Sequence, residues 1–262
     1  MSVSSSTDTV IVKYEGRTAT VMLNRPEVLN ALDEATLKEL TVKLREVAKS
    51  EADVVVLCGN GRGFSAGGDI KSMLSNTDET RFLPIMDIIS EVAVALYTMP
   101  KLVISAIHGP TAGLGLSMAL AADYIMADAS SIIAMNFIGI GLIPDGGGHF
   151  FLQNRVGAEA AKRIIWEGSK LSAEQALALG LVDEAVKENF QQAVRAKVDT
   201  WLQKPVAAMI ETKLVLADLN KDKLVQVLQA EKHGQAKMRE TADHKEGIAA
   251  FLQKRPPVFT GK

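Results

Sequence analysis

The sequence predicts an α/β fold in which alternating strands and helices are followed by a helical region. Short apolar runs rich in β-branched residues alternate with amphipathic helical stripes over the first half of the chain. A glycine-rich loop directly follows two of these apolar runs. From Arg155 onward the pattern becomes almost entirely helical. Together these observations indicate an α/β core with an appended helical region.

The first predicted elements are a hairpin, a helix and a buried strand. Residues 10–23 alternate around Glu15 and Gly16, as two strands joined by a tight turn do. Apolar residues then recur at helical spacing behind a candidate N-cap at Asp33, which predicts a helix to Ser50. Residues 53–58 are apolar and β-branched, as in a parallel strand covered on both faces, and we expect Cys58 to be a buried core thiol.

The same order of elements repeats further along the chain. An apolar stripe predicts a helix that starts just after Pro84 and stops at Pro100. A strand over residues 101–107, a small-residue turn over 108–112 and a helix ending near Ala122 follow, and residues 124–127 suit a third parallel strand. Later, Ser172 and Gln175 are spaced as a capping box, with Gly180 as a helix stop.

Composition excludes several functional classes. The chain has 262 residues, of which 47% are hydrophobic and 23% charged, and its net charge of −2 gives no electrostatic footprint for nucleic acid or an anionic membrane. A single cysteine permits neither an intrachain disulfide nor a thiolate zinc cluster. Residues 1–8 lack the basic flank and apolar stretch of a secretory signal, so we expect a cytoplasmic protein.

One segment is long enough to suggest a membrane span. Residues 102–122 carry no formal charge. Gly109 and Pro110 interrupt this segment near its middle, and further glycines follow. We therefore interpret it as a buried strand, a turn and a buried helix.

Two glycine-rich loops carry the first chemical signal. The loop over residues 59–70 contains neither Gly-Lys-Ser/Thr nor G-x-G-x-x-G, which excludes the P-loop and the dinucleotide fingerprint. Glycine lets a backbone approach a ligand closely and lets N–H groups point at an anion. One such loop would suit a tight turn, but two loops at the carboxyl ends of parallel strands predict a ligand crevice.

Three other residues are weaker candidates. Residues 115–119 come within one residue of the G-x-S-x-G nucleophile elbow, which would make Ser117 a hydrolase nucleophile. Because Ser117 falls inside a helix-forming run, we favour a small core or pocket-lining residue. His108 and His149 are possible bases, although a lone histidine beside a glycine turn is more often structural.

Asp145 has two competing interpretations. It follows an apolar stretch and precedes three glycines, and burial there would raise its pKa toward general acid/base use. Aspartate is also a favoured N-cap, and a helix over residues 150–153 follows it. The spacing alone does not separate these two interpretations.

Segments along nearly the whole chain resemble the enoyl-CoA hydratase/isomerase, or crotonase, superfamily. Any one segment is a weak match, but the ordered set is specific. The matching segments are Leu23–Leu32, Gly63–Ile70, His108–Gly115, Leu171–Ala176, Gly180–Asp183 and Glu246–Arg255.

The resemblance implies a crotonase-like spiral of ββα units over residues 1–200 and a C-terminal helical trimerisation region over residues 201–262. It further implies a homotrimer or a dimer of trimers that acts on an acyl-CoA thioester. The backbone N–H groups of Gly68 and Leu114 would form an oxyanion hole for the thioester enolate. The implied substrate-binding residues are Arg25, Val28, Ala66, Gly67, Gly68, Asp69, Ile70, Leu114, Phe137 and, from the tail of a neighbouring subunit, Phe251 and Lys254.

Two departures from the family pattern bear on the reaction. Hydratases of the family carry two glutamates, where this chain has Ser117 and Phe137, and neither side chain can activate water near neutral pH. Moving a double bond needs only one carboxylate. Asp145 stands where several isomerases of the family place an aspartate, and its segment, together with the ending Phe259–Lys262, is most similar to the isomerases of ring-epoxide CoA esters in phenylacetate breakdown.

The leading hypothesis is therefore an enoyl-CoA isomerase with Gly68 and Leu114 as oxyanion donors and Asp145 as the proton shuttle. The alternatives are an enoyl-CoA hydratase, an acyl-CoA hydrolase and a catalytically silent CoA-ester binding subunit. Many relatives have glycine at Leu114, so the pocket is expected to be narrower or shifted. Phe137 should make the acyl site drier, which suits a hydrocarbon or ring acyl group. No metal and no redox cofactor is expected, with coenzyme A entering only as part of the substrate.

Overall fold

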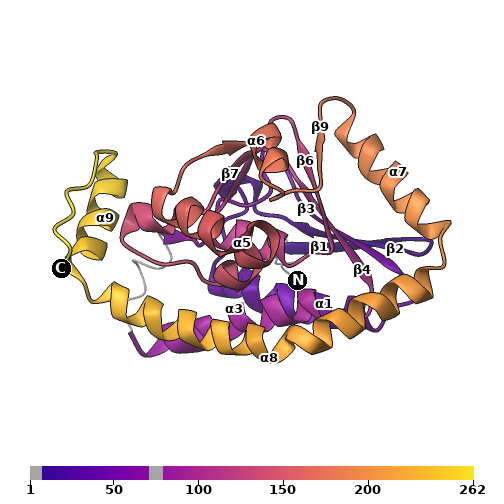
Figure 1. Ribbon diagram of the computed structural model, residues 1–262, viewed down its shortest axis with the longest axis horizontal. Helices are drawn as coiled ribbons and strands as arrows, with labels where there is room; N and C mark the ends of the chain where they lie inside the picture. Colours follow the sequence, from indigo (N-terminus) through magenta and orange to yellow (C-terminus); the bar gives the residue numbers. More distant parts are fainter. Residues whose placement is uncertain (1–7, 71–78) are drawn as a thin grey trace, which may run out of the picture.

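The computed structural model describes residues 8–70 and 79–262, and it has the mixed α/β architecture that the sequence predicts. Residues 1–7, on which most of the expectation about a secretory signal rests, lie outside the described residues. The larger sheet has the strand order β1-β2-β3-β4-β6-β9, and a smaller sheet has the order β5-β7-β8. Helices surround both sheets, and the long α8 runs along one side of the molecule (Figure 1).

Successive chain segments contribute one strand to each sheet, which produces the repeating ββα pattern. β4 and β6 lie in the larger sheet, whereas β5 and β7, which directly follow them, lie in the smaller one. The strands are β1 (Val10–Glu15), β2 (Thr18–Leu23), β3 (Val54–Gly59), β4 (Leu102–Ile107), β5 (Pro110–Ala112), β6 (Tyr124–Asp128), β7 (Ile132–Ala134), β8 (Leu171–Ser172) and β9 (Glu184–Val186).

The central strands β3 and β4 of the larger sheet are buried on both faces. β1 and β2 form the predicted antiparallel hairpin, and β2, β3, β4, β6 and β9 pair in parallel. Along β3, Val55 and Leu57 enter the main core, while Val54 and Val56 enter a second cluster beneath α7 (Phe190–Leu202). This two-residue alternation explains why the strand is uniformly apolar. Cys58 is only partly buried, so the expectation of a fully buried thiol is wrong.

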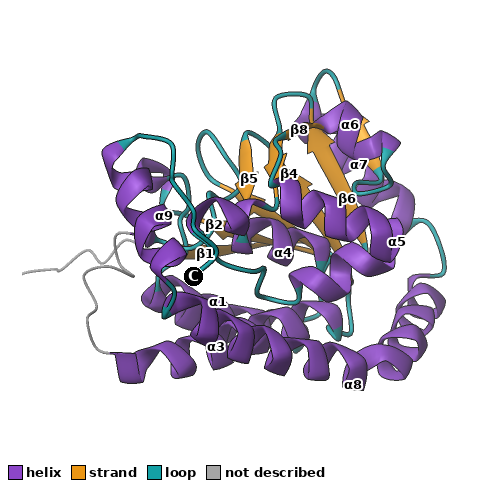
Figure 2. Cartoon of the chain, turned by 60° about the vertical axis from the view of Figure 1, so that its left-hand side comes forward, coloured by secondary structure: helices purple, strands orange, loops and turns teal. Residues whose placement is uncertain are grey.

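Three helices cover the core face of the sheet, as Figure 2 shows. α1 (Glu34–Ala48) begins at its predicted cap, where the Asp33 side chain accepts a hydrogen bond from the Thr36 N–H at 2.8 Å. α3 (Phe82–Tyr97) packs between α1 and α8 (Val206–Arg239). α3 starts at Phe82 rather than after Pro84, because a proline within the first turn removes no intrahelical hydrogen bond.

The uncharged segment over residues 102–122 folds as predicted into a strand, a turn and a helix. It contains β4, the short β5 and α4 (Leu114–Leu120), and every side chain of β4 is buried. Within the described residues, no helix has the length and apolarity that crossing a membrane requires.

The second half of the chain is less helical than the sequence indicates. After α5 (Gly148–Glu167), the short strands β8 and β9 stand on either side of α6 (Ala173–Ala178). α6 carries the predicted capping box between Ser172 and Gln175. Short 3-10 turns occupy Pro26–Val28, Glu79–Arg81 and Asn136–Ile140.

Residues 201–262 pack against the first 200 residues. Leu224 and Leu228 of α8 are buried in the main core together with residues of α1, α3 and α5. α9 (Ala242–Gln253) lies against the 3-10 turn Asn136–Ile140. The C-terminal helices therefore reach the region around residues 136–149.

Candidate active site

The two glycine-rich loops run side by side at the carboxyl ends of β3 and β4. The Ser65 N–H donates to the Pro110 carbonyl at 3.1 Å, and the Ala112 N–H donates to the Ser65 carbonyl at 3.0 Å. These bonds form a small parallel bridge between Ser65 and Thr111. The crevice predicted from the two loops is therefore framed by backbone pairing rather than by side chains.

Gly67 allows the loops to approach most closely. Its φ of +95° is a conformation that glycine adopts without strain. A Cβ atom at this position would lie 2.8 Å from the Ala112 carbonyl oxygen and 3.5 Å from the Leu114 nitrogen. The backbone at Gly67 therefore lies directly against the first turn of α4.

Two backbone N–H groups are left without acceptors at this contact. The Leu32 N–H donates to the Gly67 carbonyl, and the Leu32 carbonyl accepts from the Asp69 N–H. This pairing does not use the N–H of Gly68, which lies between the two bonded residues. Leu114 opens α4, where the first N–H groups have no partner inside the helix. Within the part of the chain that the structure describes, neither N–H has an acceptor.

A cavity of about 290 Å³ opens beside these N–H groups. Most of its wall is apolar, and its polar side chains come from several separate elements. The lining residues are Leu32, Asp33, Glu34, Leu37, Ala66, Gly67, Gly68, Asp69, Ile70, Phe82, Ile85, Met86, Ile89, Gly113, Leu114, Asn136, Phe137, Gly139, Ile140, Leu142, Asp145, Gln235, Arg239 and Phe251.

Asp145 is the buried acid of this cavity, with 8% of its surface exposed. Its Oδ2 accepts a hydrogen bond from the Gln235 amide at 3.3 Å, whereas Oδ1 has no partner within the described residues. Burial raises the pKa of the Asp145 carboxyl well above its ordinary value, and the negative charge of Glu231 raises it further. The site thus holds a carboxyl group that exchanges a proton nearer neutral pH than an exposed aspartate does.

Asp145 does not cap the following helix, so that interpretation of its position is wrong. The N-cap of α5 is Gly147, and no side chain of the preceding loop bonds to the first turn. Glu231 of α8 takes this role instead, accepting from the Gly147 N–H at 2.8 Å and the His149 N–H at 3.0 Å. The Asp145 side chain is therefore free of a capping role.

The Leu114 side chain extends away from its N–H toward the loop that holds Asp145. A Cβ atom on Gly146 would lie 2.6 Å from Leu114 Cδ1, so the leucine occupies space that the glycine leaves open. Phe137 is buried in the cavity wall and approaches Gly113 from the other side. Both apolar side chains line the cavity near Asp145 and keep its surroundings dry.

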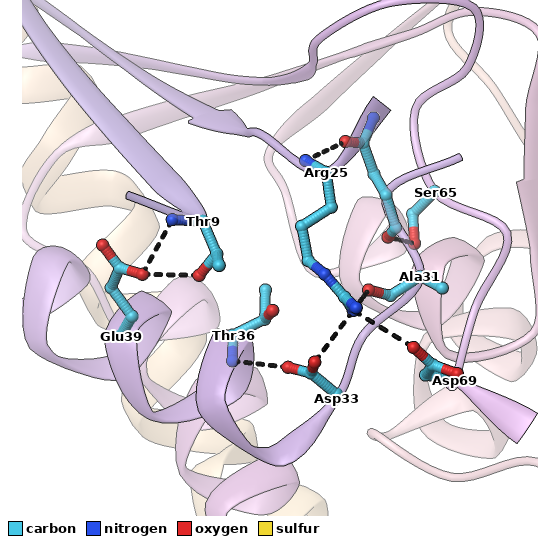
Figure 3. Close-up of polar contacts among 9 residues, drawn as sticks. Thr9, Arg25, Ala31, Asp33, Thr36, Glu39, Ser65 and Asp69 are labelled. Atoms are coloured by element: carbon cyan, nitrogen blue, oxygen red, sulfur yellow. Dashed lines mark hydrogen bonds and ion pairs between the residues drawn. The ribbon is translucent and has the colours of Figure 1, made fainter. Parts of the chain in front are cut away.

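Arg25 holds two acidic residues of the cavity lining, and Figure 3 shows its contacts with them. Its guanidinium lies 3.0 Å from the Asp33 carboxylate and 3.2 Å from that of Asp69, and it also donates to the Ala31 carbonyl at 2.7 Å. Arg25 does not itself line the cavity, but it ties α1 to the Gly63–Ile70 loop. Val28 also lies outside the lining, partly exposed on the Pro26–Val28 turn.

Of the two predicted tail residues, only one lines the cavity. Phe251 lines the cavity of its own chain from α9, whereas the resemblance assigned it to the site of a neighbouring subunit. Lys254 ends α9 in a left-handed conformation and is not a lining residue. The chain's own last helix thus contributes to the cavity wall.

The weaker candidates do not form a nucleophilic site. Ser117 is fully buried within α4, and its hydroxyl approaches the Gly113 carbonyl of its own helix at 3.5 Å. His108 contacts the Gly61 carbonyl, and His149 contacts Glu231 at 2.8 Å. Neither histidine lines the cavity. Among the described residues, no three potential ligands gather in a way that could hold a metal ion.

Sequence reasoning missed Glu231 and Gln235. Both lie in a long helix with many charged and polar positions, and nothing in their local sequence distinguishes them. Their burial, at 2% exposure each, results from contacts with residues more than 80 positions earlier in the chain. Only the spatial arrangement identifies them.

Chemically, the arrangement combines two backbone donors, a protonatable carboxyl and an apolar chamber. Two fixed N–H groups can stabilise negative charge that develops on a carbonyl oxygen. A carboxyl group with a raised pKa can accept and return a proton within the same chamber.

Comparisons with known proteins find relatives along nearly the whole chain. A family model described as enoyl-CoA hydratase/isomerase matches residues 14–262. YhaR of Bacillus subtilis, which carries the name of an enoyl-CoA hydratase/isomerase, is 48% identical over 93% of this chain and 96% of its own length. The 1,2-epoxyphenylacetyl-CoA isomerase of Escherichia coli is 33% identical over 97% of this chain and 98% of its own. The crystal structure of an enoyl-CoA hydratase from Mycobacterium avium subsp. paratuberculosis K-10 superimposes with a TM-score of 0.87 at 31% identity, covering 96% of this chain and 98% of that one.

Proposed function

Because the chain belongs to the enoyl-CoA hydratase/isomerase family, we propose that it is an enoyl-CoA isomerase, which moves a double bond of an acyl-CoA thioester without adding water. Family membership and the structural superposition confirm the predicted crotonase-like fold. Membership does not choose between hydration and isomerisation. The choice rests on the carboxylates of the cavity.

The observation that carries the proposal is that Asp145 stands alone as an unpaired acid. Asp33 and Asp69 are bound to Arg25, and Glu34 is bound to Lys38 and Arg81. Among the described lining carboxylates, Asp145 has no ion pair. A hydratase needs a second acid/base group, and neither the helix-bonded hydroxyl of Ser117 nor the ring of Phe137 supplies one.

In the proposed reaction, Gly68 and Leu114 donate their N–H groups to the thioester oxygen. Asp145 in its ionised form takes a proton from carbon 2, and the electron pair delocalises onto the thioester oxygen as a dienolate. Asp145 then returns the proton at carbon 4, which leaves the double bond between carbons 2 and 3. Losing one such donor typically costs about 3 kcal/mol of transition-state stabilisation.

The apolar lining indicates the class of acyl group. Aliphatic side chains of α3 and the Phe137 ring line the same cavity as Asp145. We therefore expect a hydrocarbon or ring acyl group, bound as its coenzyme A thioester, with no further cofactor. Apolar walls also maintain the desolvation that raises the pKa of Asp145.

The proposal is tested by offering purified protein 3-enoyl-CoA and 2-enoyl-CoA esters of several lengths and analysing the products by mass spectrometry with chromatography. We expect a shift of the double bond at constant mass, and a loss of about 100-fold or more in Asp145→Asn. Asp222→Asn, an exposed change on α8, is the matched control and should retain full activity. Because the base must be ionised, kcat/KM should fall as the pH decreases through the raised pKa of Asp145.

Four results would contradict the proposal. A product heavier by one water would identify a hydratase, and release of free coenzyme A would identify a hydrolase. Full turnover in Asp145→Asn would remove the residue from the mechanism. An absence of turnover on every ester, ring esters included, would indicate a catalytically inactive CoA-ester binding subunit.

A further inference from the structure

Two residues of α8 hold the loop that carries Asp145. Glu231 and Gln235 are four positions apart, so they lie on the same face of the helix one turn from each other. Each is 2% exposed, although α8 as a whole is rich in solvated charges. Buried polar side chains are nearly always hydrogen-bonded, so the partners of Glu231 and Gln235 indicate what the two residues hold in place.

Glu231 fixes the backbone that follows Asp145. Its two carboxylate oxygens are divided between the N–H groups of Gly147 and His149, and one of them also contacts His149 Nδ1 at 2.8 Å. This is an N-terminal cap supplied from another helix, which places a negative charge where the α5 dipole favours one. The same charge faces the nearby Asp145 carboxyl.

Gln235 distinguishes the two oxygens of Asp145. Its amide nitrogen donates to the Ile143 carbonyl and, at 3.3 Å, to Asp145 Oδ2. The amide group is a donor at this contact, so Oδ2 acts as the acceptor. Oδ1 stays unpartnered although it is buried, and Asp145 lines the cavity.

We propose that Glu231 and Gln235 are positioning residues for the proton shuttle. Gln235 occupies Oδ2, which makes Oδ1 the oxygen that exchanges the proton with the substrate, and Glu231 fixes the loop that follows Asp145. The inference rests on the proposed function, since it concerns the residue proposed as the shuttle.

The two residues act on Asp145 with opposite sign. A hydrogen bond donated to the carboxylate stabilises its ionised form, so removing the Gln235 donor should raise the pKa of Asp145. A nearby negative charge destabilises the ionised form, so removing the Glu231 charge should lower that pKa. A purely structural role for both residues would not produce opposite changes.

Other charged groups near Asp145 are held by partners of their own. His149 of α5 contacts Glu231, and Arg239, one turn beyond Gln235, stacks over the Phe82 ring at 4.5 Å. From α1 and the Gly63–Ile70 loop, Asp33, Glu34 and Asp69 line the cavity within the ion pairs already described. Glu231 is therefore the charge with the most direct effect on Asp145.

The test compares Glu231→Gln and Gln235→Met with the exposed controls Glu211→Gln and Gln229→Met on the same helix. The first readout is the pH dependence of kcat and KM for the 3-enoyl-CoA ester on which the wild type is most active. We expect the acidic limb of kcat/KM to move down by about one pH unit in Glu231→Gln and up by about one unit in Gln235→Met. In Gln235→Met, kcat should also fall by about tenfold or more with KM unchanged.

A second readout needs no turnover. The infrared carbonyl band of the protonated Asp145 carboxyl, identified by its absence in Asp145→Asn, is followed against pH in the same variants. It should titrate at lower pH in Glu231→Gln and at higher pH in Gln235→Met, while the two controls match the wild type. Thermal unfolding of each variant verifies that it is folded.

The two readouts separate failure of this inference from failure of the proposed function. If the protein is not an isomerase, the infrared titration still moves in opposite directions in the two variants. If both variants move the titration in the same direction, or neither moves it, the positioning role is refuted even when Asp145 proves essential for isomerisation. If Gln235→Met does not fold, the direction of the shift in Glu231→Gln alone decides.

Discussion

At the scale of a single residue, Asp145 links catalysis to stability. A carboxyl group whose pKa is higher in the folded than in the unfolded chain binds more protons in the folded state. Stability therefore decreases as the pH rises from the unfolded pKa, near 4, through the raised folded pKa. The group that we propose as the proton shuttle thus destabilises the fold at the pH where it is ionised.

This linkage predicts the behaviour of Asp145→Asn under heating. The amide matches the protonated carboxyl in shape but cannot ionise, so the variant should unfold at a higher temperature than the wild type at neutral and alkaline pH. The difference in unfolding temperature should grow as the pH rises from the unfolded pKa of Asp145 through its raised folded pKa, and it should disappear below about pH 4. Differential scanning calorimetry across a pH series measures it. An unfolding difference that does not depend on pH would mean that the pKa of Asp145 is not raised.

How far the site could be predicted also depends on individual residues. The glycines of the two loops identify a crevice from sequence, because their spacing after apolar strands is a local pattern. The capping alternative for Asp145 was equally compatible with that local pattern. It failed because Glu231, 84 residues beyond Gly147, already occupies the helix N-terminus. A contact between residues so far apart in the sequence does not appear in the local spacing of residues, so it could not be predicted from that spacing.

At the scale of elements, the sequence pattern predicts the helices and strands that are long enough to display a periodicity or a continuous apolar run. The hairpin and α1 follow from two-residue and helical spacing, and the strands β3, β4 and β6 follow from short apolar runs. β8 and β9, with two and three residues, are too short to display an alternation, and they form because the neighbouring strands β7 and β6 offer partners. The start of α3 at Phe82 likewise depends on its first-turn geometry rather than on its proline.

The position of α8 leads to a prediction about the element as a whole. Leu224 is fully buried, and its Cδ1 lies 3.2 Å from where a Cβ atom on Gly147 would stand, directly below the loop that follows Asp145. Leu224→Ala should lower the free energy of unfolding by about 2–5 kcal/mol, because it removes buried methyl groups and leaves a cavity. It should also lower kcat, since the loop loses its support.

The neighbouring Val225→Ala is the control for this change. Val225 is 39% exposed and should alter stability by no more than about 0.5 kcal/mol. Urea unfolding of both variants, together with their isomerase rates, measures the difference. Equal stabilities for the two variants would show that α8 is not part of the core on which the site depends.

At the scale of the whole molecule, α8 presents an apolar surface that residues 8–70 and 79–262 leave exposed. Val215, Leu216 and Leu219 are between 53% and 76% exposed, on a helix whose opposite side enters the core. Exposed apolar clusters of this kind mark contact surfaces between proteins. They agree with the expectation that residues 201–262 assemble a homotrimer or a dimer of trimers.

A substitution on this apolar surface should disrupt the oligomer without lowering kcat. Sedimentation equilibrium of the wild type should give three or six times the chain mass of 28.1 kDa. Leu219→Lys places a charge at the most exposed of the three positions and should shift the protein toward smaller species. Because residues of one chain line the cavity and hold Asp145, the dissociated chain should retain kcat for the isomerisation. A monomeric wild type would contradict the assembly, and a dissociated variant without activity would show that a neighbouring chain completes the site.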